Sequence, residues 1–333
     1  MITNTLVTCN AAKACDLLSN TKLSKLMQAN LSAIAFNDDS ITRGDLERID
    51  SQSFVPLADV ADIVWRITRK KDEANHFSDM DQEGKNSFES KTLFDLVDQD
   101  KNNIDVHIWN NFYDSLGIDA ANRGSLPFRV WQIYNEMVKF VSSVDIEKFV
   151  CAADIISHYV GDASQPLHVS KYHHGHPDIP AEKPVHAEYE TKMIERFAVD
   201  IIEGVNSELE NKKAHPGITG GINAANSIIE LMKKCVTTLP PLDIVDAFNE
   251  VQGHNRLDNM FNKLGSRTIN CISDGSLYMA MLWESAWKEG GGDSIPINKL
   301  ILCDISSLKS LYENKSFLEA FRLTDQGYID VLR

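Results

Sequence analysis

Two pairs of side chains suited to metal binding constrain the fold more than any other feature of this chain. His158 and Asp162 are four residues apart, and so are His186 and Glu190. At this spacing both members of a pair lie on one face of an α-helix, because one helical turn contains 3.6 residues. The pattern therefore predicts two helices that each present two ligands to a common region.

A bend that contains proline lies between the two predicted helices. Pro166 cannot continue a helix, because its ring removes an amide hydrogen and clashes with the preceding turn. We therefore expect His168 to be presented from a bend. The loop 171–183, which contains glycine and proline, separates the two helices. We interpret three histidines in this loop as a solvated cluster, with the rim of a substrate site as the alternative. These are His173, His174 and His176.

Helical periodicity extends over most of the chain. Apolar residues recur at three- and four-residue steps, whereas the alternation typical of strands is hard to find, so we expect an all-α protein. Three consecutive glycines at 290–292 predict a helix end and a flexible joint. We expect one multi-helix domain over residues 1–292 and a short C-terminal helical appendix over 293–333. The predicted helical segments are 11–35, 57–69, 127–141, 146–160, 185–209, 221–235 and 276–288.

The charge of the chain argues against general binding of polyanions. It has 33 basic and 48 acidic residues and a formal net charge of −15, whereas affinity for nucleic acid depends on Lys and Arg contacts to phosphates. If the chain acts on nucleic acid, we expect nucleic acid to be a substrate and not a stably bound partner. Neither a signal peptide nor an apolar stretch of about 20 residues is evident. We therefore expect no stable membrane insertion, and a location in the cytoplasm or export by a non-standard route.

Two upstream residues can complete the metal site. Asp62 lies in a predicted helix, and His76 follows at a predicted helix-to-loop transition. An isolated histidine–carboxylate pair is more often a surface hydrogen bond or ion pair than a metal site. Two such pairs, a histidine at a bend and these upstream residues together favour a metal centre, and hydrolytic metals often work in pairs.

Taken in their order along the chain, these motifs resemble those of the superfamily that joins zinc-dependent phospholipases C and single-strand-specific three-zinc nucleases. Its pattern is a distant Asp, His-Phe-x-Asp, HxxxD, Gln-Pro-(Leu/Met)-His, and HxxxE or HxxxD. The resemblance covers roughly residues 55–200 by motif and extends to about 290, so that residues 1–50 and the appendix are unmatched. It implies an all-α fold of this type and a zinc centre. One zinc would be bound by Asp62, His76, His158 and Asp162, and the second by His168, His186 and Glu190.

The third zinc of this superfamily is where the chain departs from the pattern. Family members bind it through the shared carboxylate, here Asp162, a nearby His, and the free amine and carbonyl of an N-terminal Trp. In this chain the first Trp is Trp65 and the first His is His76. We expect two zinc ions and leave a third open. Substitute ligands to consider are Asp154, His107, Cys9 and Cys15.

The resemblance implies a zinc-dependent phosphodiester hydrolase of the phospholipase C-like kind. A hydroxide that bridges the metals would attack phosphorus, and Asp62 would orient that water or take its proton. The expected substrate is a phospholipid or another phosphodiester, because Glu190 stands where the nucleases typically have Asp. The alternatives are a single-strand-specific zinc nuclease that releases 5′-nucleotides and a catalytically reduced zinc-binding protein.

Phe77 and Asp79 are candidate substrate contacts, because they follow His76 directly. Phe77 either packs beneath the site or stacks on a substrate. Asp79 and Asp81 also have a second interpretation, in which they hold His76 in its ligand tautomer or cap the following turn. For Tyr159 we expect packing beneath the site.

Overall fold

All regular secondary structure in the described part of the chain is helical. The computed structural model describes residues 5–35 and 54–332, with the backbone alone for residues 5–9, and it contains no β-strand within these ranges. The predicted all-α class is confirmed.

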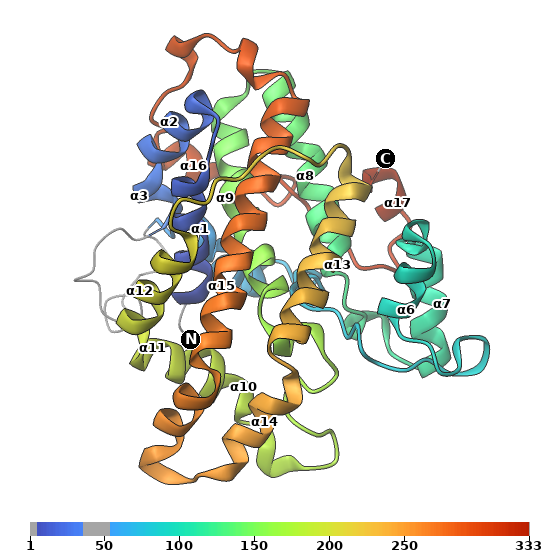
Figure 1. Ribbon diagram of the computed structural model, residues 1–333. Helices are drawn as coiled ribbons and strands as arrows, with labels where there is room; N and C mark the ends of the chain where they lie inside the picture. Colours follow the sequence, from blue (N-terminus) through green and yellow to red (C-terminus); the bar gives the residue numbers. More distant parts are fainter. Residues whose placement is uncertain (1–4, 36–53, 333) are drawn as a thin grey trace.

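Two buried helices form the centre of the fold. α8 (Leu126–Ser142) packs along α9 (Ile146–Ala163), and both contact α13 (Gly221–Thr238) and α15 (Arg256–Glu289). Figure 1 shows α15 running along most of the height of the molecule, next to α1 (Thr5–Leu17). α9 is apolar nearly all round and buried nearly all round, which is typical of a helix inside a large core. The predicted ligands on α9 therefore lie inside the protein.

Several helices differ in extent from the predicted segments, because local hydrogen bonds decide where a helix begins. The segment 11–35 contains an interruption at Asn20, whose side chain accepts hydrogen bonds from two backbone amides and starts a new helix. The helix predicted over 276–288 begins twenty residues earlier, at Arg256. The remaining α-helices outside the metal site are α2 (Thr21–Ala29), α3 (Leu31–Ile34), α5 (Arg66–Thr68), α6 (Leu93–Gln99), α7 (Val106–Leu116), α11 (Ile194–Arg196), α12 (Ala198–Leu209) and α14 (Pro241–Glu250).

The segment after the triple glycine packs closely on the rest of the fold. α16 (Ile305–Glu313) lies against α9, and α17 (Tyr328–Leu332) lies against α8. Arg69 donates hydrogen bonds to four backbone carbonyls of this segment, and its guanidinium lies 3.8 Å from the ring centroid of Trp65. Since Arg69 is itself buried, these bonds fix the path of the chain at residues 312–318.

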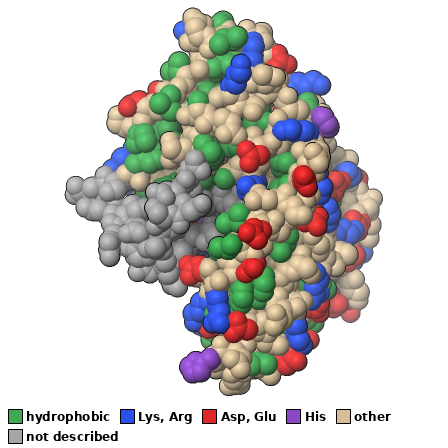
Figure 2. All heavy atoms as spheres, turned by 60° about the vertical axis from the view of Figure 1, so that its left-hand side comes forward, with side chains coloured by type: hydrophobic (Ala, Val, Ile, Leu, Met, Phe, Trp, Pro, Cys, Tyr) green, Lys and Arg blue, Asp and Glu red, His purple; other side chains and the backbone are tan. Residues whose placement is uncertain are grey.

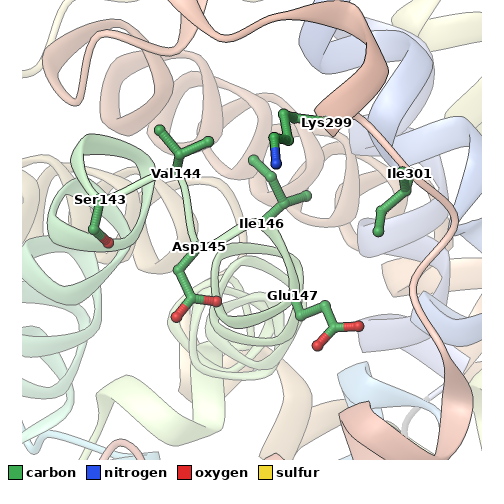
Figure 3. Close-up of a pocket in the computed structure, with 7 residues that line it drawn as sticks. All are labelled: Ser143, Val144, Asp145, Ile146, Glu147, Lys299 and Ile301. Atoms are coloured by element: carbon green, nitrogen blue, oxygen red, sulfur yellow. The ribbon is translucent and has the colours of Figure 1, made fainter.

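The surface shows mixed charge on the face drawn in Figure 2, where acidic and basic side chains are interspersed. A hollow of about 390 Å³ lies at the first turn of α9, beside Lys299 and Ile301 (Figure 3). Its distance from His158 is about 18 Å along the helix axis, at 1.5 Å per residue, so the hollow is separate from the predicted ligands.

Within the described residues, no helix is both long enough and apolar enough to span a membrane.

Candidate metal centre

The structure brings the seven predicted ligands together from six different helical elements. α9 carries two of them, and the other five lie on short helices or helix ends around it. Within the described residues, two groups of ligand atoms lie within 4.8 Å of one another. The first group is Asp62, His76 and His158, and the second is His168, His186 and Glu190.

Asp162 adjoins the first group through its two histidines. Its Oδ2 atom lies 3.0 Å from Nδ1 of His76 and 3.5 Å from Nε2 of His158. Oδ1 of Asp62 lies 3.7 Å and 3.5 Å from the same two nitrogens, which are 3.1 Å apart. A tetrahedral zinc ion with ligands at about 2.0–2.1 Å has ligand-to-ligand distances of about 3.3–3.4 Å. Five of the distances among these four atoms therefore lie between 3.0 and 3.7 Å, close to the separation of ligands around a single metal ion.

The groups that face the outer nitrogens of the two histidines favour bare nitrogens on the side of the first group. Nδ1 of His158 donates to the carbonyl oxygen of Ala58 at 3.0 Å, so Nε2 carries no hydrogen in the neutral ring. Nε2 of His76 faces a carboxylate oxygen of Asp72 at 3.5 Å, which favours the hydrogen on Nε2 and leaves Nδ1 bare. Two lone pairs and two carboxylates thus converge on one point, and they repel one another unless positive charge lies between them.

The second group is built in the same way from three donors. Nε2 of His168 lies 3.1 Å from Nε2 of His186 and 3.1 Å from Oε2 of Glu190, and these last two atoms are 2.5 Å apart. Nδ1 of His168 donates to the carbonyl of His76, and Nδ1 of His186 donates to the carbonyl of His173. Three protein ligands are one fewer than a closed tetrahedral site requires, which is typical of a catalytic metal.

The Gln-Pro-Leu-His segment connects the two groups. His168 lies on the 3₁₀ turn η7 (Pro166–Val169), where Oδ1 of Asp162 is 3.3 Å from its Nδ1 atom. The amide of Gln165 donates to Oε2 of Glu190 at 2.9 Å, and its carbonyl oxygen accepts from the backbone amide of Leu167. Gln165 therefore orients a ligand as well as shaping the bend.

Two of the carboxylate ligands lie in π-helical stretches. Asp62 lies in η2 (Ala61–Trp65) and Glu190 in η9 (Glu188–Met193), so the predicted helices 57–69 and 185–209 are each divided. His186 lies just before, on α10 (Val185–Ala187), and His76 ends the 3₁₀ turn η3 (Asp72–His76). A π-helical turn inserts an extra residue, redirects the side chains around it and is frequent at functional sites.

The crowding of carboxylates around the histidines shapes the electrostatics of the site. Burial disfavours the charged form of His158, but Asp162 and Asp62 outweigh this effect and raise the pKa of His158 to about 10. Burial also opposes the charged form of His168, but Asp162 and Glu190 raise its pKa to about 9. Both shifts have the same physical meaning: the site stabilises positive charge, which protons or metal ions can supply.

One side of the first group is open to solvent. The side chains of His76, His158 and Asp162 are at most 2% exposed, whereas that of Asp62 is 21% exposed. Arg66 pairs with Asp62 at 3.2 Å and is 37% exposed. The first group therefore reaches the protein surface at Asp62 and Arg66.

Among the side chains that the structure describes, in residues 10–35 and 54–332, no third group of three or more metal ligands is found. Asp154 is fully buried and neither of its oxygens has a hydrogen-bond partner; burial raises its pKa well above the usual value, which favours the neutral acid. His107 is exposed on α7, and Cys15 is a buried free thiol. The side chain of Cys9 lies outside the described residues.

Phe77 and Asp79 lie beside the histidine loop. The ring centroid of Phe77 is 6.4 Å from that of His173, and Oδ1 of Asp79 is 3.7 Å from Nδ1 of His173. The backbone carbonyl of His173 also holds the metal ligand His186. Phe77 and Asp79 therefore adjoin the second group through His173. Their role as substrate contacts stays a prediction.

Asp72 is the carboxylate that faces Nε2 of His76, and the sequence patterns did not single it out. Asp81 accepts hydrogen bonds from Ser170 and from the backbone amide of Lys171, so the expectation that it holds His76 is wrong. Asp72 occupies that place. A signal for it exists in the sequence, because Asp72 precedes His76 by four residues, the spacing of the ligand pairs themselves.

The chain is similar to a probable serine protease of Bradyrhizobium tropiciagri. The two are 31% identical over 95% of this chain and 47% of the relative, so the chain spans about half the length of the curated relative it matches. No family model and no solved structure matches the chain.

This relative contradicts the function expected from the sequence. The expectation is a zinc-dependent phosphodiester hydrolase of the phospholipase C-like kind, with a single-strand nuclease or a catalytically reduced zinc-binding protein as alternatives. A protease cleaves amide bonds, whereas the expected enzymes cleave bonds between phosphorus and oxygen, so the expected activity is wrong. The convergence of the seven ligands is a separate finding, since it depends on the geometry alone.

A serine nucleophile activated by histidine is not found in the described part of the chain. Such a nucleophile requires a hydrogen bond between a serine hydroxyl and a histidine ring nitrogen. Within residues 5–35 and 54–332, the hydrogen bonds of histidine rings go to backbone carbonyls, carboxylates or other histidines. The two ligand groups are therefore the site in the described structure that is best arranged to activate water.

Proposed function

We propose that this chain binds two zinc ions through its seven ligands, as the superfamily pattern implies, and that it hydrolyses peptide bonds with water activated at this centre. The observation that carries the proposal is the set of distances between His76 and His158 and from these two histidines to Asp62 and Asp162, which are all 3.0–3.7 Å.

The donor set suits zinc. Imidazole nitrogens and carboxylate oxygens in tetrahedral positions are the usual ligands of zinc in proteins, whereas calcium and magnesium prefer six or more oxygen ligands. Every histidine in the two groups also has its second ring nitrogen directed at a carbonyl or carboxylate, which fixes the ring and the tautomer.

The chemistry that a metal pair supplies is a water of lowered pKa and a polarised carbonyl group. The chain's own residues then decide orientation. Asp62 is the most exposed carboxylate of the first group, so it is placed to orient the attacking water and to accept its proton. Arg66, beside it, is placed to hold a carbonyl or carboxylate group of the substrate.

Peptide bonds are the proposed substrate class because the relative is named a probable serine protease. The chain matches only about half of that protein, and its described part lacks a serine–histidine pair. We therefore propose hydrolysis by metal-activated water for this chain and not by a serine nucleophile.

Elemental analysis and peptide hydrolysis by the purified chain test the proposal together. We expect about two zinc ions per chain and cleavage of a fluorogenic peptide library that a chelator abolishes, that zinc restores and that a serine-reactive fluorophosphonate does not affect. His158→Ala should lose both zinc and activity, whereas His107→Ala, on an exposed histidine of α7, should keep both. Protein without zinc would refute the metal centre. Full zinc without cleavage, or cleavage blocked by the fluorophosphonate alone, would refute metal-dependent peptide hydrolysis.

A further inference from the structure

The second ring nitrogen of His76 faces a carboxylate alone, whereas that of His168 faces both a backbone carbonyl and, at 3.3 Å, Oδ1 of Asp162. His158, His168 and His186 each direct their second nitrogen at a backbone carbonyl, at 2.9–3.0 Å. His76 instead directs Nε2 at a carboxylate oxygen of Asp72, at 3.5 Å. A carboxylate partner makes the opposite ring nitrogen more electron-rich and a better metal ligand than a carbonyl partner does.

Asp72 is completely buried and held from three sides. The hydroxyl of Tyr159 lies 2.9 Å and 3.0 Å from its two oxygens, and the amide of Asn75 donates to Oδ1 at 3.1 Å. The guanidinium of Arg129 lies 3.4 Å from Oδ1. These contacts fix the carboxylate next to His76.

Arg129 is also completely buried, and the C-terminal segment determines where its guanidinium lies. It donates to the backbone carbonyls of Leu318 and Glu319 at 3.0 Å each and to the side chain of Gln132 at 2.8 Å. Gln132 in turn donates to the carbonyl of Glu319 at 2.8 Å. The planar, multiply donating guanidinium can bind these carbonyls and the carboxylate at once, which an ammonium group cannot do.

We propose that Asp72 and Arg129 are positioning residues for the metal ligand His76, and that residues 318–319 of the C-terminal segment complete this support. The proposal rests on the metal centre of the proposed function. Contacts run without a gap from the carbonyls of Leu318 and Glu319 through Arg129 and Asp72 to the ring of His76. The segment after the triple glycine, far from the ligands in sequence, thereby supports the first metal site.

Metal affinity of matched variants tests this role. Asp72→Asn keeps the shape of the side chain but removes its charge, and we expect zinc affinity at the first site to fall by about 10–100-fold in a competition assay with a chromophoric chelator. Asp81→Asn is the matched control, since Asp81 binds Ser170 and Lys171 and touches no metal ligand; its zinc affinity should stay within about twofold of wild type. Tyr159→Phe, a milder change, removes the hydroxyl that holds Asp72 and should lower the affinity by a smaller factor.

Cobalt substitution separates positioning from a merely structural role. The visible absorption bands of Co²⁺ bound at the first site should shift in Asp72→Asn and in Arg129→Lys but not in Asp81→Asn, at temperatures where all variants are folded by circular dichroism. Unchanged zinc affinity and unchanged absorption bands in Asp72→Asn would overturn the positioning role. If Asp72→Asn does not fold, the same result in Tyr159→Phe and Arg129→Lys would overturn it. Wild-type protein that binds neither metal would instead refute the metal centre, and the positioning role with it.

Discussion

Removal of the metal should make the stability of this protein fall as pH rises through the neutral range. In the metal-free protein the carboxylates of the two groups raise the pKa of His158 to about 10 and that of His168 to about 9, although burial opposes both charged forms. The ordinary histidine pKa in an unfolded chain is about 6.5. The folded protein therefore binds more protons than the unfolded chain between about pH 6.5 and 9.

The sign and size of the effect follow from proton linkage. A raised folded-state pKa contributes stability that is fully present below pH 6.5 and is lost as pH rises towards 9 and 10. Each extra proton on the folded state changes the free energy of unfolding by about 1 kcal/mol per pH unit. The two histidines share Asp162 as a neighbour, so we expect a combined loss of about 1–3 kcal/mol per pH unit between pH 7 and 9.

Zinc should suppress this dependence, because a bound metal takes the place of the protons and keeps the ligands deprotonated. The assay is urea unfolding followed by tryptophan fluorescence at pH 6.5, 7.5 and 8.5, once with a chelator and once with excess zinc. Trp65, Trp109, Trp283 and Trp287 are all buried and report on unfolding. A free energy of unfolding that does not depend on pH in the chelator would refute the convergence of bare nitrogens and carboxylates on which the metal centre depends.

Three further predictions concern single substitutions. Arg69→Ala should lower the free energy of unfolding by about 3–5 kcal/mol, measured by urea unfolding, because it leaves four carbonyls of the C-terminal segment without their donor. Gln165→Ala should weaken zinc binding at the second group by about tenfold, measured by chelator competition, because Glu190 loses its partner; an unchanged affinity would contradict that role. Gly221→Ala should cost about 1–3 kcal/mol of stability, seen as a lower urea midpoint, because the new methyl group would lie 1.8 Å from the ring of Trp131. A midpoint equal to that of wild type would show that Trp131 moves aside freely.

The sequence alone was sufficient for the fold class, and it indicated the residues that the structure gathers into two groups of candidate ligands. The all-α class followed from apolar residues at three- and four-residue steps, a pattern that depends only on local helix geometry. Five candidate ligands followed from spacing, because residues four apart share a helix face and proline forces a bend before His168, whereas Asp62 and His76 followed from the order of motifs along the chain. Such signals are short in range, so a single chain displays them without its fold.

Local pattern was insufficient for the details of the helices that carry the ligands. Asp62 and Glu190 lie in π-helical stretches where the sequence predicted continuous helices. A π-helical turn is favoured by tertiary contacts and not by the propensities of its residues, and apolar periodicity does not distinguish it from an α-helix.

Only the tertiary structure decided which groups hold the ligands in place. Asp72, Arg129 and the carbonyls of residues 318–319 support His76, yet they lie up to about 240 residues away from it along the chain. Backbone carbonyls leave no mark in a sequence, because every residue has one. A buried arginine likewise has no partner until the fold supplies it. The choice of candidate ligands is therefore a property of the sequence, whereas their orientation is a property of the folded protein.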